Sequence, residues 1–219
     1  VMGREHQITI ALAVAVLAAC ANLQRSRDLG NPEVAGRVLA EQVCSNCHGV
    51  TGSSVSPNMP NLAGQQKTYL VAQLRGFREK SRQDPAGYEY MWGISRTLTD
   101  RQIDELADYF SMQTLRPQRI ESPPARIEAG RAIFTGGVPD SGVPACLSCH
   151  GPDALGTDMY PRLNGQHADY IAKQLLVFQR TDQRPAGAVM KVVAHGLTPS
   201  AVDDVAAYLQ AMPGLAGAR

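Results

Sequence analysis

Apolar residues recur at helical spacing in two similar stretches, one in each half of the chain. The first stripe consists of Ile103, Leu106, Ala107 and Phe110, and the second of Val202, Val205, Ala206 and Leu209. A capping-box pattern, Thr99 to Gln102, precedes the first stripe, and Thr198-Pro199 precedes the second. No stretch alternates apolar and polar residues as a strand does. The pattern therefore predicts an all-α fold.

Two further helices are expected ahead of these stripes. Asn31-Pro32 offers a cap and a first-turn proline, which predicts a helix from there to Val43. Residues 125–134 have the same role in the second half. Each half thus has a helix near its start and another at its end.

The two halves are a tandem repeat. The segment PNLAGQ at 60–65 matches PRLNGQ at 161–166, and YLVAQL at 69–74 matches YIAKQL at 170–175. The pairs DPAG and RPAG, then Leu98-Thr99 and Leu197-Thr198, continue the match. Between the halves, residues 113–124 are polar and contain prolines, as linkers often do. We predict an N-terminal domain at 31–112 and a C-terminal domain at 125–213.

The first residues carry a targeting signal. Residues 8–19 are almost wholly apolar and follow Arg4, but they are too few to span a bilayer comfortably. We interpret residues 1–19 as a secretory signal. The sequence Leu17-Ala-Ala-Cys20 also resembles a bacterial lipoprotein signal, with Cys20 as the lipidated residue. An ordinary signal with a chance cysteine, or a segment retained as an anchor, are the alternatives. Each version places the folded part beyond the cytoplasmic membrane.

Charge and composition narrow the function. The 219 residues carry a formal net charge of +1, and neither half has a basic excess, so nucleic acid is not an expected partner. Aromatic residues make up 5% of the chain. Small domains with so few aromatics need additional hydrophobic bulk in their cores.

Four of the five cysteines lie in two identical frames. Cys44 and Cys47 are followed by His48, and Cys146 and Cys149 by His150. C-x-x-C-H is the pattern of covalent haem attachment, in which two thiols on one helical turn bind the vinyl edge and the histidine binds the iron. A redox C-x-x-C needs no histidine and sits in a βαβ unit, and zinc motifs lie much closer together. Disulfides would leave both histidines unexplained. The sequence predicts two haem c groups, which also supply the missing core.

The repeat identifies candidates for the second axial ligand. An electron carrier needs two strong ligands, and methionine opposite histidine raises the reduction potential. Met91 lies seven residues before Leu98, and Met190 lies seven before Leu197. Met59 and Met159 share no such register. We therefore expect Met91 and Met190 to bind the irons together with His48 and His150.

These motifs resemble those of the cytochrome c4 family, dihaem members of the class I cytochromes c, from about residue 31 to residue 212. The resemblance implies two tandem class I domains, each wrapping one covalently bound haem c. It also implies that the carbonyls of Pro60 and Pro161 accept the Nδ1–H of the ligating histidines. Met91 and Met190 match the axial methionines of the family.

The same resemblance implies a function. Family members carry single electrons in bacterial respiratory chains, here between a membrane donor such as a quinol-oxidising complex and a haem-copper terminal oxidase or similar acceptor. We expect no substrate chemistry from the protein itself. Its expected place is the periplasmic side of the membrane, anchored by a lipid or a retained segment, or else soluble. A stable electron-accepting subunit of a dehydrogenase or respiratory complex is one alternative, and a dihaem peroxidase-type enzyme is another.

Overall fold

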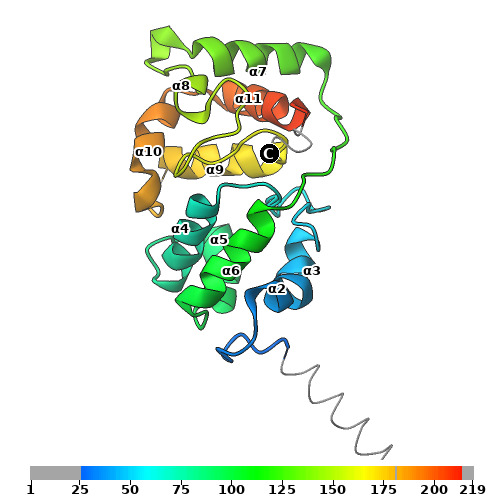
Figure 1. Ribbon diagram of the computed structural model, residues 1–219. Coiled ribbons are helices and arrows are strands. Elements are labelled where there is room, and N and C mark those ends of the chain that lie inside the picture. Colours follow the sequence, from blue (N-terminus) through cyan, green and yellow to red (C-terminus); the bar gives the residue numbers. More distant parts are fainter. Residues whose placement is uncertain (1–25, 181, 214–219) are drawn as a thin grey trace, which may run out of the picture.

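Two helical units, joined by a segment without helix, make up the described part of the computed structural model, residues 26–180 and 182–213 (Figure 1). The first unit contains α2 (Gly36–Leu39), the π-helical η1 (Ala40–Cys44), α3 (Ser45–His48), α4 (Lys67–Arg78), α5 (Pro85–Ser95) and α6 (Asp100–Ser111). The second contains α7 (Pro124–Gly136), the short η2 (Pro139–Ser141), α8 (Leu147–His150), α9 (Ala168–Arg180), η3 (Pro185–Gly187), α10 (Ala188–His195) and α11 (Pro199–Ala211).

The all-α prediction is confirmed for these residues, whose only extended pairings are two isolated bridges, Val138 with Val143 and Thr157 with Tyr160. The predicted signal at 1–19 and Cys20 lie outside the described residues.

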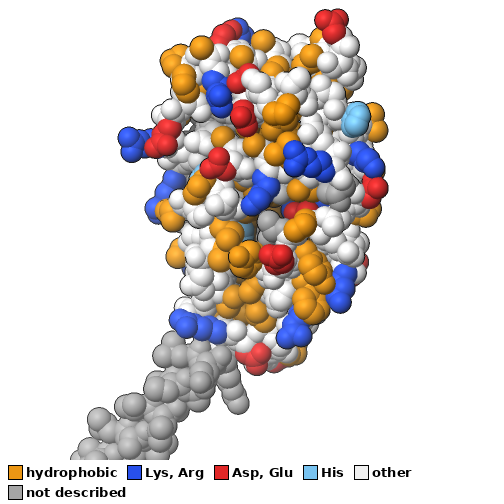
Figure 2. All heavy atoms as spheres, turned by 180° about the vertical axis from the view of Figure 1, so that it is seen from behind, with side chains coloured by type: hydrophobic (Ala, Val, Ile, Leu, Met, Phe, Trp, Pro, Cys, Tyr) orange, Lys and Arg blue, Asp and Glu red, His pale blue; other side chains and the backbone are white. Residues whose placement is uncertain are grey.

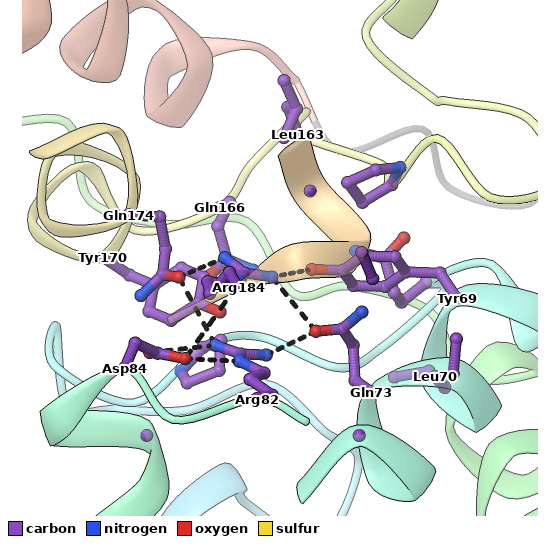
Figure 3. A pocket seen from close by; sticks show the side chains of 18 of the residues that line it. Tyr69, Leu70, Gln73, Arg82, Asp84, Leu163, Gln166, Tyr170, Gln174 and Arg184 are labelled. Carbon is purple, nitrogen blue, oxygen red and sulfur yellow. Dashed lines mark hydrogen bonds and ion pairs between the residues drawn. The ribbon is translucent and has the colours of Figure 1, made fainter. Parts of the chain in front are cut away.

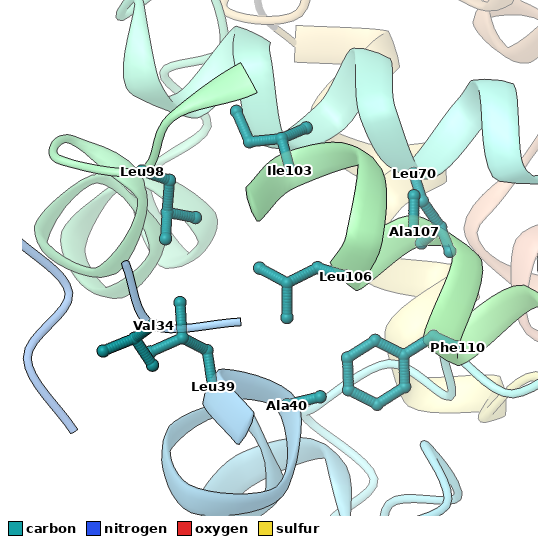
Figure 4. Close-up of a cluster of buried hydrophobic side chains, with 9 residues drawn as sticks. All are labelled: Val34, Leu39, Ala40, Leu70, Leu98, Ile103, Leu106, Ala107 and Phe110. Atoms are coloured by element: carbon teal, nitrogen blue, oxygen red, sulfur yellow. The ribbon is translucent and has the colours of Figure 1, made fainter. Parts of the chain in front are cut away.

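Helix α6 forms as its sequence predicts. The Thr99 hydroxyl accepts a hydrogen bond from the Gln102 N–H, and the Gln102 side chain bonds back to the Thr99 N–H, so the capping box is complete. The apolar stripe of α6 is buried against α2 and α4 (Figure 4). Burial of such side chains stabilises a fold by about 25 cal/mol per Å². This stripe is the centre of the first core.

The predicted start of the first helix is wrong. Asn31 does not cap a helix; its side chain accepts the Glu33 N–H at 3.0 Å and closes a turn. Helix α2 begins only at Gly36. The turn is held to α6 by the Gln102 amide, which donates to the carbonyls of Asn31 and Val34 at 3.0 and 2.9 Å. Asparagine favours such local turns because its side chain competes for nearby backbone groups.

The second unit packs α7 across α11, and its buried side chains fall into two clusters. Phe134, Val205 and Leu209 belong to one cluster. Val143 and Leu197 belong to the other. The apolar stripe predicted for α11 is buried and contributes to both.

The two units meet through their repeated G-Q segments. Gln65 accepts the Arg162 N–H at 2.7 Å and donates to the Arg162 carbonyl at 3.0 Å. Gln166 pairs in the same way with Asn61, at 2.8 and 3.0 Å. Because each amide satisfies one backbone donor and one acceptor, these exchanges form a two-fold-like joint of buried hydrogen bonds.

Candidate haem-binding sites

Each C-x-x-C-H motif lies on a single helical turn that a glycine ends. In the first unit the turn leads from η1 into α3, and in the second it includes α8. Gly49 and Gly151, which follow the histidines, have φ of 75° and 78°. This left-handed region favours glycine. At Gly49 a Cβ would also lie 2.5 Å from the Ser53 carbonyl oxygen. The turn thus presents both thiols and the imidazole from one short segment.

Both motif histidines are buried and held at one ring nitrogen. His48 Nδ1 lies 2.9 Å from the Pro60 carbonyl oxygen, and His150 Nδ1 lies 3.0 Å from that of Pro161. A carbonyl only accepts, so Nδ1 carries the proton and Nε2 is left to bind a metal. Burial, opposed in part by this bond, lowers the pKa of both imidazoles, which keeps them neutral at physiological pH. A neutral imidazole is the form that binds iron.

The four thiols are not joined in disulfides. Burial raises the pKa of the Cys44 thiol to about 12 and that of Cys146 to about 11. Redox-active and metal-binding cysteines depend on a lowered pKa, so these surroundings do not suit thiolate chemistry. Cys47 and Cys149 are exposed. Each pair therefore has one sulfur towards the interior and one at the surface.

A cavity of about 760 Å³ connects the two motifs and is lined from both units. The motif cysteines and histidines lie on its wall, as do Met91 from α5 and Met190 from α10. Many further wall residues are apolar, among them Leu70, Leu74, Ile94, Leu98, Ile171, Leu175, Val193 and Leu197. Met59 and Met159, which share no register in the repeat, line it too. The assignment of Met91 and Met190 as iron ligands thus stays a prediction.

The wall fits haem c in its chemistry. Thiol pairs, an imidazole with Nε2 available and thioether sulfurs surround an apolar cavity, which suits a flat hydrophobic macrocycle with an iron at its centre. An orphaned group fits as well: Arg162 is buried on this wall, its Nε has no hydrogen-bond partner, and burial lowers its pKa to about 10. A buried guanidinium without an acid nearby suits a cofactor that brings carboxylates.

Two further histidines and Arg162 do not have the position of an iron ligand. His195, five residues after Met190, is exposed and does not line the cavity. His167 Nε2 lies 3.1 Å from the Ser54 carbonyl oxygen across the joint, which is a structural contact between the units. Arg162 also donates to the Ala63 carbonyl at 2.6 Å, which ties the second unit to the first.

Sequence reasoning missed a polar cluster on the cavity wall between the units. Arg82, Asp84 and Arg184 are buried there and contact the side chains of Gln73 and Gln174 (Figure 3). The signal was present in the repeat, since residues 82–87 read RQDPAG and 182–187 read DQRPAG. The charges have exchanged places in that motif. Only the fold shows that Arg82 and Arg184 meet.

Comparison with known proteins agrees with this chemistry. The family described as "Cytochrome c" matches residues 33–114 and 127–213. Cytochrome c4 of Stutzerimonas stutzeri is 37% identical over 179 residues, which cover 78% of this chain and 84% of that protein. The crystal structure of reduced cytochrome c4 from Pseudomonas stutzeri is similar, with a TM-score of 0.74 and 34% identity over 84% of this chain and all of that chain.

A further relative has a different name. The "thiosulfate dehydrogenase electron acceptor" of Thiomonas intermedia is 34% identical over 180 residues, which cover 78% of each chain.

Proposed function

The chain belongs to the cytochrome c4 family of dihaem electron-transfer proteins, and we propose that it passes single electrons between a membrane donor and a terminal oxidase or similar acceptor. It carries two covalently bound haem c groups, as the members of this family do. The observation that supports the carrier role most strongly is the duplicated ligand set, in which both units place histidine, two thiols and methionine on one apolar cavity.

We assign the covalent links to Cys44 and Cys47 in the first unit and to Cys146 and Cys149 in the second. Bound haem c supplies an iron that cycles between the ferric and ferrous states. His48 and His150 would hold this iron through Nε2, because their Nδ1–H groups donate to the carbonyls of Pro60 and Pro161. That bond fixes the ring and makes the imidazole a better donor.

In this proposal, Met91 and Met190 would supply the thioether sulfurs that hold the two irons together with the histidines. Helix α5 holds Met91 in place, and the Ser95 hydroxyl donates to the Met91 carbonyl at 2.7 Å. With a histidine and a methionine holding each iron, no ligand position would be left for a substrate, which supports a carrier without substrate chemistry of its own.

The surface suits brief contacts with redox partners. Cys47 and Cys149 are exposed, so a haem attached to them would have one edge near the solvent, where a partner can approach. On the face drawn in Figure 2, basic and acidic side chains are interspersed, and no large area has a single sign. Long-range steering by net charge is therefore weak, and local contacts decide docking.

A quinol-oxidising complex as donor and a haem-copper oxidase as acceptor fit this carrier role on the periplasmic side of the bacterial membrane. Among the residues described, no helix has the length and apolar character of a membrane span. Attachment to the membrane through a lipid on Cys20 or through the N-terminal segment belongs to this proposal, and mass spectrometry of the membrane fraction tests it.

The relative from Thiomonas intermedia favours a second candidate, a dedicated electron acceptor of a dehydrogenase. A dedicated acceptor stays with its enzyme, whereas a shuttle leaves it. Co-purification of a dehydrogenase at fixed stoichiometry from detergent-solubilised membranes would support this candidate and count against the mobile carrier.

Methionine variants test the ligand assignment. We expect Met91→Ala and Met190→Ala each to remove about half of the weak near-red band that marks methionine sulfur on ferric haem, and to lower the potential of one haem. Met59→Leu and Met159→Leu are the matched controls, since these side chains line the same cavity. A band that survives both alanine variants but falls in a control would transfer the ligand role to the control residue.

A further inference from the structure

The joint between the units contains two matching side-chain contacts that differ in one residue. Gln66 Nε2 donates to the Leu155 carbonyl at 2.9 Å, and His167 Nε2 lies 3.1 Å from the Ser54 carbonyl oxygen. Gln66 and His167 each follow the repeated G-Q pair, and their acceptors are aligned in the repeat as well. The two contacts are therefore equivalent by the repeat, but only the second contains an ionisable side chain.

The contact determines which ring nitrogen of His167 has a free lone pair. A carbonyl oxygen only accepts hydrogen bonds, so Nε2 carries the proton and Nδ1 carries none. Among the described residues, the fully buried side-chain nitrogens and oxygens that lack a hydrogen-bond partner are Arg162 Nε and Asn164 Oδ1. Nδ1 of His167, to which no described residue donates, is not one of these atoms, so water reaches it. The ring can therefore accept a second proton at Nδ1 and keep its bond to Ser54.

His167 lies in surroundings that favour its neutral form at neutral pH. The residue is 8% exposed, and burial lowers the pKa of its imidazole below the usual value. The bond to the Ser54 carbonyl and the negative charge of Asp169, on the same helix, oppose this shift in part. The imidazole therefore becomes charged in the mildly acidic range, and a change of charge nearby shifts that titration.

The other elements packed around His167 bring few charges. Residues 49–61, the first-unit segment that it contacts, contain no ionisable side chain. The last two turns of α11, which meet the start of α9, contain Tyr208 and no charged residue. In the linker, Arg116 and Arg119 are exposed, so the solvent screens their charges. The charge state of His167 thus depends mainly on its burial and on its contact with the first unit.

The Ser54 contact leads directly to the first haem-attachment motif. Ser54 Oγ donates to the Cys47 carbonyl at 2.9 Å, and the Ser54 N–H donates to the Asn61 side chain at 2.9 Å. A haem attached to Cys47 would therefore lie close to the contact that His167 makes. Charges interact more strongly in a protein interior than in water, because the effective dielectric constant is lower. An electron that arrives at the first iron thus alters the proton affinity of His167.

We propose that His167 is a proton-binding site coupled to the electron on the first haem. The inference rests on the proposed function, because it needs an iron held by His48. When the first unit receives one electron from a redox partner, which reduces its iron from ferric to ferrous, the Nδ1 lone pair of His167 binds one proton from the solvent. The imidazolium balances the added negative charge, and no other bond forms or breaks. The reduced form is therefore stabilised as the pH falls through the titration of His167.

His167→Gln tests the coupling, since Gln66 already makes the equivalent contact. The variant keeps a hydrogen bond to Ser54 but removes the titration. We expect the reduced-to-oxidised ratio of the first haem at a fixed potential to rise as the pH falls from 8 to 4.5. The rise should be about threefold larger in wild type than in the variant, which is the effect of unit charges roughly 25 Å apart at an effective dielectric constant of about 20. Redox titrations of the holoprotein, followed at the haem methyl NMR signals that distinguish the two haems, measure this ratio.

His195→Gln is the matched control. It also replaces an imidazole by an amide, but His195 is exposed on α10 and does not line the cavity. The control should retain the wild-type pH dependence of the first haem. The coupling is overturned if His167→Gln retains that dependence as well, or if the control loses it.

A second measurement uses the wild-type holoprotein and needs no variant to fold. In NMR titrations, the pKa of the His167 imidazole should be higher in the fully reduced protein than in the fully oxidised protein, because the ferrous site has one positive charge fewer. Equal values in the two states, in a protein whose mass includes both haems, overturn the coupling and leave the proposed function intact. A protein that releases its colour in acid acetone would instead overturn the proposed function, because it would hold no covalent haem.

Discussion

The two units reach the same C-x-x-C-H turn by different paths. In the first unit the chain runs from α2 through the π-helical η1 directly into α3. In the second, α7 is thirteen residues long and ends at Gly136, and a loop through η2 then leads to Cys146. The sequence G-R-x-[LI], at 36–39 and 130–133, is common to both helices. The divergence begins after it.

The extra loop replaces a segment that only the first unit has. In the first unit, Val34 from the turn before α2 belongs to the same buried cluster as Leu98. In the second, the repeat partner Leu197 is buried with Val143, which lies in the loop after α7. The loop fits closely, since a Cβ on Gly196 would lie 2.3 Å from the Ser141 carbonyl oxygen. Leu98 and Leu197 must both be shielded from solvent. The segment that shields them can precede the first helix of the unit, as Val34 does, or follow it, as Val143 does.

The cores differ as a result. The first unit has one cluster that extends from Val34 to Phe110. The second has two clusters, and partly buried Ile133, Ala172 and Leu175 pack against both. A core in two parts gains more from a large apolar cofactor that touches both of them. We therefore expect the second unit to depend more strongly on its haem.

Removal of one haem at a time should produce the largest effect. Cys44→Ala with Cys47→Ala, and Cys146→Ala with Cys149→Ala, each abolish one pair of attachment points, and the mass should fall by one haem in each case. The second variant should lose more stability in chemical unfolding, with a difference on the order of 2 kcal/mol, because its core is divided.

Haem content decides how that experiment is interpreted. A holoprotein with both pairs intact, expressed and purified in parallel, is the reference for mass and for unfolding. If the two variants lose equal stability, or if the first loses more, the division of the second core does not make that unit more dependent on its haem.

Substitutions at the crossings of the first and last helices should have the next largest effect on stability. Gly36 and Gly130 lie where the first and last helices of their units pack together. A Cβ at Gly130 would lie 2.0 Å from the Asp204 carbonyl oxygen, whereas at Gly36 it would meet the Glu105 Cβ at 2.5 Å and a backbone nitrogen at 2.9 Å. We expect Gly130→Ala to cost about 3 kcal/mol or more, and more than Gly36→Ala, because a helix backbone cannot move aside locally.

Thermal unfolding of the two variants measures this order. Gly93→Ala is a suitable control, since no atom lies within 4 Å of the added Cβ. Equal losses of stability in the Gly36 and Gly130 variants would contradict this order, because both helix pairs would then accommodate the added Cβ equally well.

The sequence predicted the parts of the fold that local rules determine. The capping box at Thr99 and the stripe of α6 follow from spacing alone, and the structure confirms both. The start at Asn31 was wrong because an asparagine followed by proline can close a turn as readily as it caps a helix. The turn is stabilised by the Gln102 amide, which donates to the Asn31 carbonyl and lies 71 residues away in the chain.

The candidate sites show the same limit. The motif cysteines and histidines were identified from a contiguous pattern, and the structure places them on one cavity. Arg82 and Arg184 were not, because their meeting depends on how the repeats face each other. An exchange of charges between two copies of a motif does not predict a contact unless it is known that the two copies lie side by side.

The smallest expected effect concerns the first N–H group of each opening helix. Helix α7 begins with Pro124, which has no N–H to satisfy, but α2 begins with Gly36, whose N–H donates to Glu105 Oε2 at 2.5 Å. This bond, with a smaller contribution from Arg101, lowers the pKa of Glu105. A lowered carboxyl pKa adds stability above the unfolded value of about 4.3, and that stability is lost as the pH falls through the folded value.

Glu105→Gln should therefore cost about 1 kcal/mol at pH 7, a modest figure because a third of the carboxylate side chain is exposed. The difference from wild type should shrink as the pH falls from about 4.3 through the lowered pKa of Glu105, because the wild-type side chain then becomes neutral as well. Asp204→Asn is the control in the second unit, where the nearest cation, Arg126, is 3.5 Å away and no helix N–H depends on the acid. Urea unfolding at pH 7 and pH 3 measures both. A pH-independent loss would assign the role of Glu105 to packing, and the two units would then differ in path but not in how their first helices are capped.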